Sequence, residues 1–154
     1  MLNQTFVVLP KFLKETNYVD PTDNTKCPWQ LGHNTNKSLF EWLEANPDLN
    51  DDYFFEWMAS QRDGMPTFFD VIDFGKELAQ GADDSTVLFV DIGGAAGHQC
   101  VAFKAKYARL KGRVVLQDLP HVINSVRERP LPGFEGVETQ VYNALETLQP
   151  IKGE

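Results

Sequence analysis

The stretch Val87-Leu-Phe-Val-Asp-Ile-Gly-Gly-Ala-Ala-Gly97 decides the fold that this 154-residue sequence predicts. Its first four residues form a short apolar run with β-branched ends, which is typical of a strand buried on both faces. The strand ends at Asp91, a glycine-bearing turn follows at 93–97, and a helix is expected from 98 to 110. Glycine lets the backbone approach a ligand, and a helix N-terminus offers free N–H groups to it. Strand, turn and helix together predict a nucleotide-binding element.

The spacing of the glycines distinguishes between two classes of cofactor. A dinucleotide-binding fingerprint has the pattern G-x-G-x-x-G. Started at either Gly93 or Gly94, this pattern meets residues other than glycine at both later positions. The pattern present is acid-x-Gly-x-x-x-Gly, which resembles the first motif of methyltransferases that depend on S-adenosylmethionine (SAM). An ordinary strand-to-helix turn without a ligand is the alternative interpretation.

A second acid favours a bound nucleoside. Residues 113–117 have the composition of the next strand, and Asp118 closes it 21 residues after Gly97. An acid in this position can accept hydrogen bonds from both hydroxyl groups of a ribose. Asp118 is equally suited to capping a helix that begins near Pro120, since proline favours the first helical turn. The sequence leaves both roles open.

The composition limits the class of protein and its partners. Hydrophobic residues make up 42% of the chain and charged residues 23%, which is typical of a globular protein. The formal net charge of −8 argues against nucleic acid or an anionic membrane as a partner. No apolar run approaches the ~20 residues that a membrane span requires. The N-terminus shows no charged leader before an apolar core, so no signal peptide is expected.

The two cysteines, Cys27 and Cys100, have neither the spacing of a zinc site nor that of a disulfide framework. They fit a reducing compartment, and we expect the protein to be cytoplasmic. No cluster of side chains predicts a metal site.

The order of predicted elements indicates two parts. Helices are expected at 10–15, after Ser38, after Asn46-Pro47 and at 73–80, with a loop-rich stretch at 17–36 in which a hairpin is conceivable. The polar stretch 81–85 is the predicted boundary, giving a helical part at 1–82 and a second part at 83–154. In the second part strands and helices alternate, at 87–91, 98–110, 113–117, 120–128 and 136–142. This order predicts half of a parallel α/β sheet, in which ligands bind at the carboxyl ends of the strands.

One helical stretch has an aromatic face. Its apolar residues recur at spacings of three to five, and they are Leu49, Tyr53, Phe54, Trp57 and Met58. Such a face more often belongs to a core than to the wall of a substrate pocket, and we expect it to be buried. The acids Asp48, Asp51 and Asp52 are expected near the positive end of this helix, with Asn46 as its cap.

The run 89–98, followed by 112–120, resembles the SAM-binding half of fungal O-methyltransferases, the family related to plant caffeic acid O-methyltransferases. Residues 28–31, 40–43 and 149–153 also resemble segments of that family, in the same order. The resemblance implies a partial Rossmann-like class I methyltransferase sheet (βαβαβ), preceded by α-helices from the end of a dimerisation (winged-helix) region. It implies methyl transfer from SAM to a phenol or enol hydroxyl of an aromatic or polyketide-like secondary metabolite.

The resemblance also implies which residues bind the cofactor. The loop that holds SAM corresponds to Asp91, Gly93, Gly94 and Gly97. Asp118 would bind the ribose, and Leu119 would lie against the adenine. Two positions depart from the family pattern: Ala95 replaces a third glycine, and Ala144 stands where the family has an acid near the adenine amine, with Asn143 next to it.

No catalytic residue is assigned. Methylating a hydroxyl requires a base near the attacking oxygen, because a phenol with a pKa of about 10 is mostly neutral at pH 7. The family's base is a histidine that follows the segment 149–153. His33, His98 and His121 do not match it, so we expect the isolated chain to be inactive.

Three hypotheses follow. The chain is an O-methyltransferase family member that needs further segments or a partner chain for activity. Alternatively, it is a non-catalytic SAM-binding or interaction protein that associates with a full-length relative. A SAM-assisted rearrangement without methyl transfer is the third. Because strand 87–91 would be central in the family's sheet, its open edge predicts a homo- or hetero-oligomer.

Overall fold

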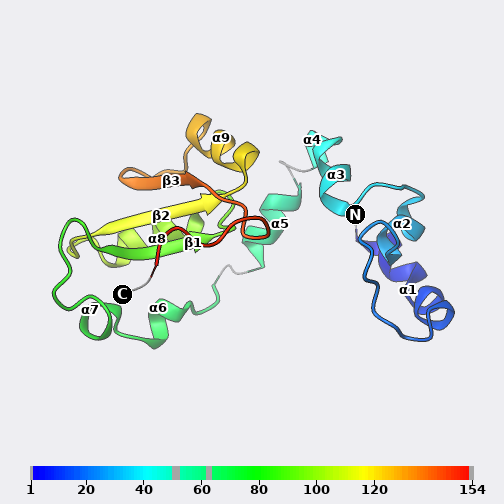
Figure 1. The fold of residues 1–154 in the computed structure, drawn as a ribbon, viewed down its shortest axis with the longest axis horizontal. Coiled ribbons are helices and arrows are strands. Elements are labelled where there is room, and N and C mark those ends of the chain that lie inside the picture. Colours follow the sequence, from blue (N-terminus) through cyan, green and yellow to red (C-terminus); the bar gives the residue numbers. More distant parts are fainter. Residues whose placement is uncertain (1, 50–52, 62–63, 153–154) are drawn as a thin grey trace. The chain divides into compact units, whose positions relative to one another are not determined.

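The computed structural model describes residues 2–49, 53–61 and 64–152 (Figure 1). These residues form two compact units, which divide between residues 63 and 64. The boundary predicted between residues 82 and 83 therefore falls inside the second unit.

The stretch 64–82 folds with the strands for two reasons. Phe69, Phe74 and Ala79 pack into the same apolar core as the sheet. Lys106 also fastens this stretch, because it donates to the carbonyl oxygen of Phe69 and pairs with the Asp70 carboxylate at 2.8 Å. The polar residues 81–85 are a loop within the unit and do not separate two units.

The first unit contains five helices within its described residues: α1 (Asn3–Glu15), α2 (Pro28–His33), α3 (Leu39–Glu44), α4 (Pro47–Leu49) and α5 (Phe55–Ser60). The helix expected at 10–15 is longer than predicted, because the chain stays helical through Pro10, whose missing N–H removes only one backbone bond. The stretch 17–36 is described throughout and contains α2 in place of a hairpin.

Helices α1 and α2 pack closely. A Cβ atom at Gly32 would lie 2.7 Å from the carbonyl oxygen of Gln4, so a side chain at this position would force the helices apart. Trp29 stacks on His33 with 3.7 Å between ring centroids, and it meets Trp42 of α3 edge-on at 5.5 Å. Trp29 of the segment 28–31 is therefore part of the buried core of the first unit, together with Leu43 of α3.

The predicted aromatic face is mostly exposed, so the expectation of a buried core is wrong here. Phe54 is buried, but Tyr53 is 65% exposed and Trp57 is 44% exposed. The spacing assumed one continuous helix, whereas the structure describes a three-residue α4 and a separate α5. Asn46 donates from Nδ2 to the carbonyl oxygen of Trp42 at the end of α3, at 2.7 Å. Asp51 and Asp52 lie outside the described residues.

The second unit contains the predicted parallel sheet. Its strands are β1 (Val87–Ile92), β2 (Arg113–Asp118) and β3 (Val137–Val141), hydrogen-bonded in that order. Helices α8 (His98–Lys106) and α9 (Pro120–Glu128) connect them. This confirms the partial Rossmann-like βαβαβ fold. Helix α8 ends before residue 110 because the chain turns back at Gly112 (φ +134°), where Leu88 and the carbonyl of Thr86 leave no room for a side chain.

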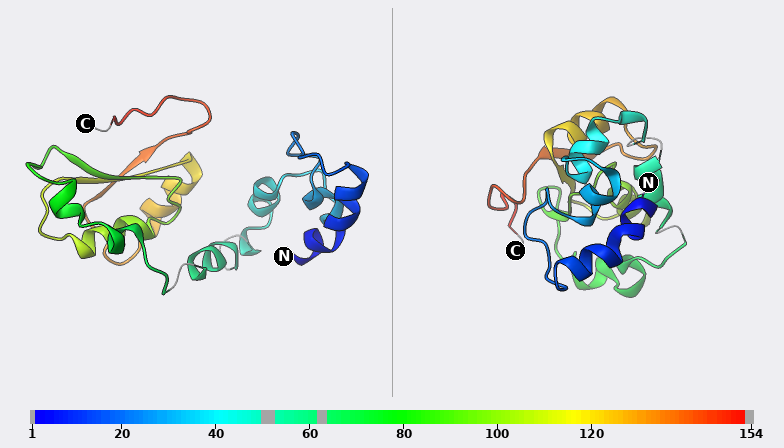
Figure 2. Two further views of the ribbon diagram at one scale, coloured as in Figure 1. Left: turned by 90° about the horizontal axis from the view of Figure 1, so that it is seen from below. Right: turned by 90° about the vertical axis from the view of Figure 1, so that its right-hand side faces the viewer.

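Helices cover one face of this sheet, including the short α6 (Phe68–Val71) and α7 (Phe74–Glu77). Phe89 of β1 stacks on Phe103 of α8 at 5.0 Å, and Leu116 of β2 and Ile123 of α9 are completely buried in the same core. The last described residues, drawn in red, cross the opposite face (Figure 2).

The buried strand is β2, not β1. Val114 to Gln117 are all at most 4% exposed, whereas every residue of β1 is partly or largely exposed. The expectation that the apolar run 87–90 is buried on both faces is therefore wrong for the described residues. The reason is that β2 has a hydrogen-bonded neighbour on each side, whereas β1 pairs with β2 alone within 64–152.

Candidate cofactor site

The glycine turn lies beside the carboxyl ends of β1 and β2 and is fastened to β2 at two points. The N–H of Gly93 donates to the carbonyl oxygen of Gln117 at 2.7 Å. The N–H of Ala95 donates to Oδ2 of Asp118 at 2.8 Å. The two acids predicted from the sequence, Asp91 and Asp118, are therefore brought to the same end of the sheet. This is the end at which parallel sheets of this kind bind ligands.

Two glycines of the turn are required by their surroundings. A Cβ atom at Gly94 would lie 2.4 Å from the carboxylate of Asp91 and 2.6 Å from a methyl group of Leu116. At Gly97, which has φ +84° and is the N-terminal cap of α8, a Cβ would lie 2.6 Å from the ring of Phe134. The absence of side chains thus lets the turn lie directly on the strand ends.

Ala95 adopts a conformation that usually belongs to glycine. Its φ is +49°, in the left-handed region that costs an L-residue about 1–2 kcal/mol. The bond from its N–H to Asp118 holds it there. Having alanine at this position, where the family has glycine, therefore introduces backbone strain. The turn nevertheless accommodates the methyl group and keeps its hydrogen bond to β2.

Asp91 is partly buried in an environment that disfavours its charge. Burial raises the pKa of this carboxyl group, and the negative charge of Asp118 raises it further. The thiol of Cys100 donates to this carboxylate, with its Sγ 3.9 Å from Oδ2. The thiol is itself fully buried, and burial together with Asp91 raises its pKa to about 12. Cys100 is therefore a neutral and weak hydrogen-bond donor. It leaves the charge of Asp91 largely uncompensated, so a cation placed near Asp91 would be attracted to the carboxylate.

Both oxygens of Asp118 accept from the backbone. Oδ2 accepts from Ala95, and Oδ1 accepts from the N–H of Leu119 at 2.7 Å. Leu119 occupies the cap position of α9, which has no side-chain capping bond. The alternative role of Asp118 as the cap of that helix is therefore not what the geometry shows. The side chain of Leu119 is 38% exposed, which leaves an apolar contact surface next to the carboxylate.

The remaining predicted positions are distributed differently. His98 and His121 are exposed in the first turns of α8 and α9. Asn143 accepts from the N–H of Leu145 through its side-chain oxygen, at 3.0 Å, so its amide stabilises its own turn. Sequence reasoning did not single out Gln117, which accepts from Gly93 of the turn, or Phe134, which packs against Gly97. The position of a glutamine within an apolar strand was a signal for Gln117, whereas no pattern marked Phe134.

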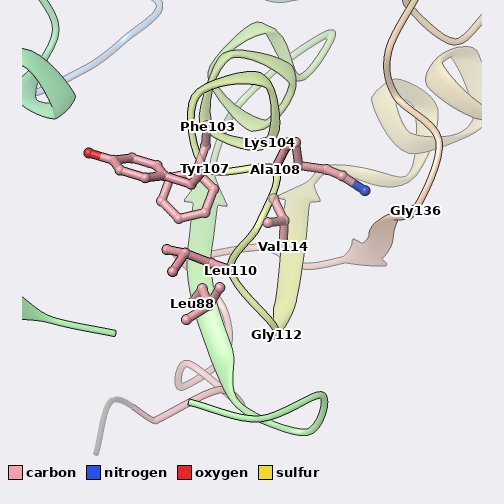
Figure 3. A pocket seen from close by; sticks show the side chains of 9 residues that line it. All are labelled: Leu88, Phe103, Lys104, Tyr107, Ala108, Leu110, Gly112, Val114 and Gly136. Carbon is pink, nitrogen blue, oxygen red and sulfur yellow. The ribbon is translucent and has the colours of Figure 1, made fainter. Parts of the chain in front are cut away.

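A cavity in the second unit lies at the other end of the strands (Figure 3). It has a volume of about 150 Å³. Its lining comes from the starts of β1 and β2, the end of α8 and the residue before β3: Leu88, Phe103, Lys104, Tyr107, Ala108, Leu110, Gly112, Val114 and Gly136. It is therefore separate from the candidate cofactor site.

Similarity to known proteins identifies the family. The chain is 36% identical over 151 residues to the O-methyltransferase dpmpI of Macrophomina phaseolina, an alignment that covers 97% of this chain and 75% of that protein. The chain belongs to the O-methyltransferase family. No family model matches the sequence.

Solved structures of related proteins share the fold of this member of the O-methyltransferase family. LepI in complex with SAM is 33% identical, with a TM-score of 0.75. A protein described as a pericyclic reaction enzyme has the same identity and TM-score. OxaC in complex with sinefungin and meleagrin is 28% identical, with a TM-score of 0.77. Each similarity covers 99% of this chain but only 38% of the solved protein. The chain therefore spans less than two fifths of the length of these structures.

Neither a metal-binding cluster nor a membrane-spanning helix is found among the described residues. Among residues 2–49, 53–61 and 64–152, no three or more His, Cys, Asp or Glu side chains are grouped so that they could hold a metal ion. None of the helices in these ranges has the length and apolar character needed to cross a membrane.

Proposed function

We propose that the chain binds SAM at the carboxyl ends of β1 and β2 and provides the cofactor half of an O-methyltransferase. The observation that carries the proposal is the bond from Ala95 to Asp118, which brings the glycine turn and the second-strand acid together. Family membership and the SAM complex of the related LepI support it.

The proposed role of Asp118 is compatible with its present bonds. Each carboxylate oxygen has two lone pairs and accepts one backbone N–H here. One lone pair on each oxygen therefore remains for a ribose hydroxyl. Leu119 offers the adjacent apolar surface to the adenine. We propose that Gly93, Gly94 and Gly97 let the turn lie along the amino-acid part of the cofactor.

The charge of Asp91 gives a reason for selecting SAM. Bound SAM supplies an electrophilic methyl group on a positively charged sulfonium, and it also carries an ammonium group. Asp91 is a partly buried carboxylate whose charge is disfavoured by burial and by Asp118. A cationic ligand at this end of the sheet would offset both the cost of burying the Asp91 charge and its repulsion by Asp118. We therefore propose that Asp91 favours a cationic cofactor over a neutral nucleoside.

We propose that the acceptor is a small molecule with a phenol or enol hydroxyl. Transfer forms a bond between the methyl carbon and the hydroxyl oxygen, the carbon–sulfur pair stays on sulfur, and the hydroxyl proton goes to a base. His98 and His121 are poor candidates for this base, since both are exposed in first helical turns. The proposed base comes from outside these 154 residues, in a further segment or a partner chain.

A second candidate is a SAM-assisted rearrangement in which the methyl group stays on the cofactor. The similarity to a protein described as a pericyclic reaction enzyme favours it. It predicts product formation without loss of SAM, and accumulation of S-adenosylhomocysteine (SAH) in step with product would contradict it.

Association with another chain is the remaining candidate. It is favoured by the partly exposed β1, which pairs with one strand among the described residues. Unpaired strand edges invite pairing with a further strand. Sedimentation of the purified chain as a stable monomer at all concentrations would contradict it.

Titration calorimetry with SAM and SAH tests the main proposal. We expect binding of micromolar order, lost in Asp118→Ala. Asp84→Ala is the matched control, because Asp84 is an exposed acid of the 81–85 loop, and it should bind like the wild type. A folded chain that binds neither compound would contradict the proposal.

A further inference from the structure

Gln117 carries a carboxamide that is completely buried at the end of β2. A buried amide requires hydrogen-bond partners for both its donors and its acceptor. Its Nε2 donates to Oε1 of Gln140 at 2.6 Å and to Oε1 of Gln149 at 2.9 Å. Its own Oε1 accepts from Nε2 of Gln149 at 2.7 Å. Gln117 and Gln149 are thus joined by a reciprocal pair of amide bonds.

Gln149 attaches the last described segment to the sheet. Its Oε1 also accepts from the N–H of Ile151 at 3.0 Å, which fixes the backbone after the pair. Leu145 is 96% exposed and Leu148 is 95% exposed, so neither anchors the segment, whereas Ile151 is partly buried. The polar bonds to Gln117 are therefore a specific part of this attachment.

The main chain of Gln117 supports the glycine turn. Its carbonyl oxygen accepts from Gly93, and the following residue, Asp118, accepts from Ala95. Gln117 therefore connects the amide pair, through its own side chain and backbone, to both fastening points of the turn. These contacts link Gln149 to the candidate cofactor site.

We infer that Gln149 is a positioning residue of the cofactor site: by pairing with the buried amide of Gln117, it fixes the end of β2 from which the turn and Asp118 are held. The inference rests on the proposed function, because the site it positions is the proposed SAM site. Gln149 acts through Gln117 and does not touch the cofactor.

The test uses Gln149→Met in the 154-residue chain, because methionine keeps the length of the side chain and removes its polar contacts. SAH is titrated at a temperature at which each variant is folded. We expect binding to weaken about tenfold, the loss that corresponds to one or two neutral hydrogen bonds. Gln149→Glu keeps both acceptor contacts of Oε1 but sets a carboxylate oxygen against Oε1 of Gln117, so it should weaken binding at least as much as Gln149→Met. Gln80→Met is the matched control, because Gln80 is exposed and its amide donates to the carbonyl oxygen of Lys76 on its own stretch of chain.

Two further readouts separate positioning from a general loss of stability. In an Asp118→Asn background, Gln149→Met should weaken SAH binding less than about twofold, because the two residues act on one path. Hydrogen exchange at the amides of Gly93 and Ala95 should also accelerate in Gln149→Met without SAH, relative to the amides of β3.

The outcomes distinguish the inference from the function on which it rests. If the wild type binds SAH and Gln149→Met binds it equally well, the inference is overturned and the proposed function stands. Additive losses in the double variant, or unchanged exchange at Gly93 and Ala95, would also overturn it. If the folded wild type binds no SAH, the proposed function fails and the inference fails with it.

Discussion

The backbone N–H of Ala95 and the carboxylate of Asp118 are joined at 2.8 Å, although 23 positions separate them in the sequence. This bond holds a residue of the glycine turn in a left-handed conformation, with φ +49°. The acid that we propose as the ribose ligand is therefore also the residue that shapes the turn. Its two tasks have separate consequences, which substitutions can distinguish.

Replacing Ala95 by glycine should stabilise the chain. Glycine adopts a positive φ without the steric cost that alanine incurs, so we expect the free energy of unfolding to rise by about 1 kcal/mol. Urea denaturation of the wild type and the variant measures it. Ala96→Gly is the matched control: the neighbouring Ala96 does not have a positive φ, so this change should lower stability. A loss of stability in Ala95→Gly would show that Ala95 is not under backbone strain.

Gly94→Ala should damage both stability and cofactor binding. The new Cβ would lie 2.4 Å from the Asp91 carboxylate and 2.6 Å from Leu116, and relieving such overlap costs about 1–3 kcal/mol. Gly93→Ala provides the comparison, because no atom lies within 4 Å of its Cβ position and only its φ of +70° opposes the change. Thermal unfolding and SAH titration should show the larger effect at Gly94. Equal effects at the two positions would contradict the packing argument.

Asp91→Asn should stabilise the unliganded chain at pH 7. The pKa of Asp91 is raised from 3.8 by burial and by Asp118, so the folded state binds a proton more tightly than the unfolded state. Ionised Asp91 therefore opposes folding at pH values above its folded pKa, and this cost disappears as the pH falls to 3.8. Denaturation at several pH values should show a gain at pH 7 that vanishes on acidification.

Asp70→Asn is the control with the opposite sign. Hydrogen bonds from Lys106 and Thr67 lower the pKa of Asp70 to about 2. Its charge therefore favours folding above pH 3.8, and this contribution is lost as the pH falls through about 2. The variant should be less stable than the wild type at pH 7. If both substitutions changed stability in the same direction, the electrostatic account of Asp91 would be wrong.

The two cysteines should differ in reactivity. Cys100 is fully buried and its pKa is raised to about 12, so almost no thiolate is present near pH 8. Cys27 is partly exposed. Brief treatment of the folded chain with iodoacetamide, followed by peptide mass analysis, should label Cys27 and leave Cys100 unmodified. Labelling of Cys100 at a similar rate would show that the environment of Asp91 opens in solution.

The sequence predicted the parts of the second unit that depend on local pattern. Apolar runs, terminal acids and glycine spacing identified all three strands, and α9 has the predicted bounds, since proline begins it. Two contacts were beyond such reasoning. The pair formed by Gln117 and Gln149 joins positions 32 residues apart, and the packing of Phe134 against Gly97 involves a loop without periodicity.

In the first part of the chain, local pattern was less informative. Proline was treated as a helix start at residue 10, although the helix tolerates it in its interior. The aromatic spacing of residues 49–58 assumed a continuous helix. The boundary was placed by the polar composition of 81–85, whereas Phe69 and Phe74 are held in the sheet's core by contacts with Phe103. Burial against distant residues decided these cases.

The attachment of Phe69 and Asp70 to Lys106 determines where the chain can be cut to produce a fragment or a chimaera. A fragment that starts at residue 83 would lack these partners and expose the ring of Phe103 to water, so we expect it to aggregate during expression. A chimaera that exchanges the helical unit with that of a relative should be joined near residues 63 and 64, where the two units divide. The natural place to recombine these proteins is thus ahead of the short helices, not at the polar loop before the first strand.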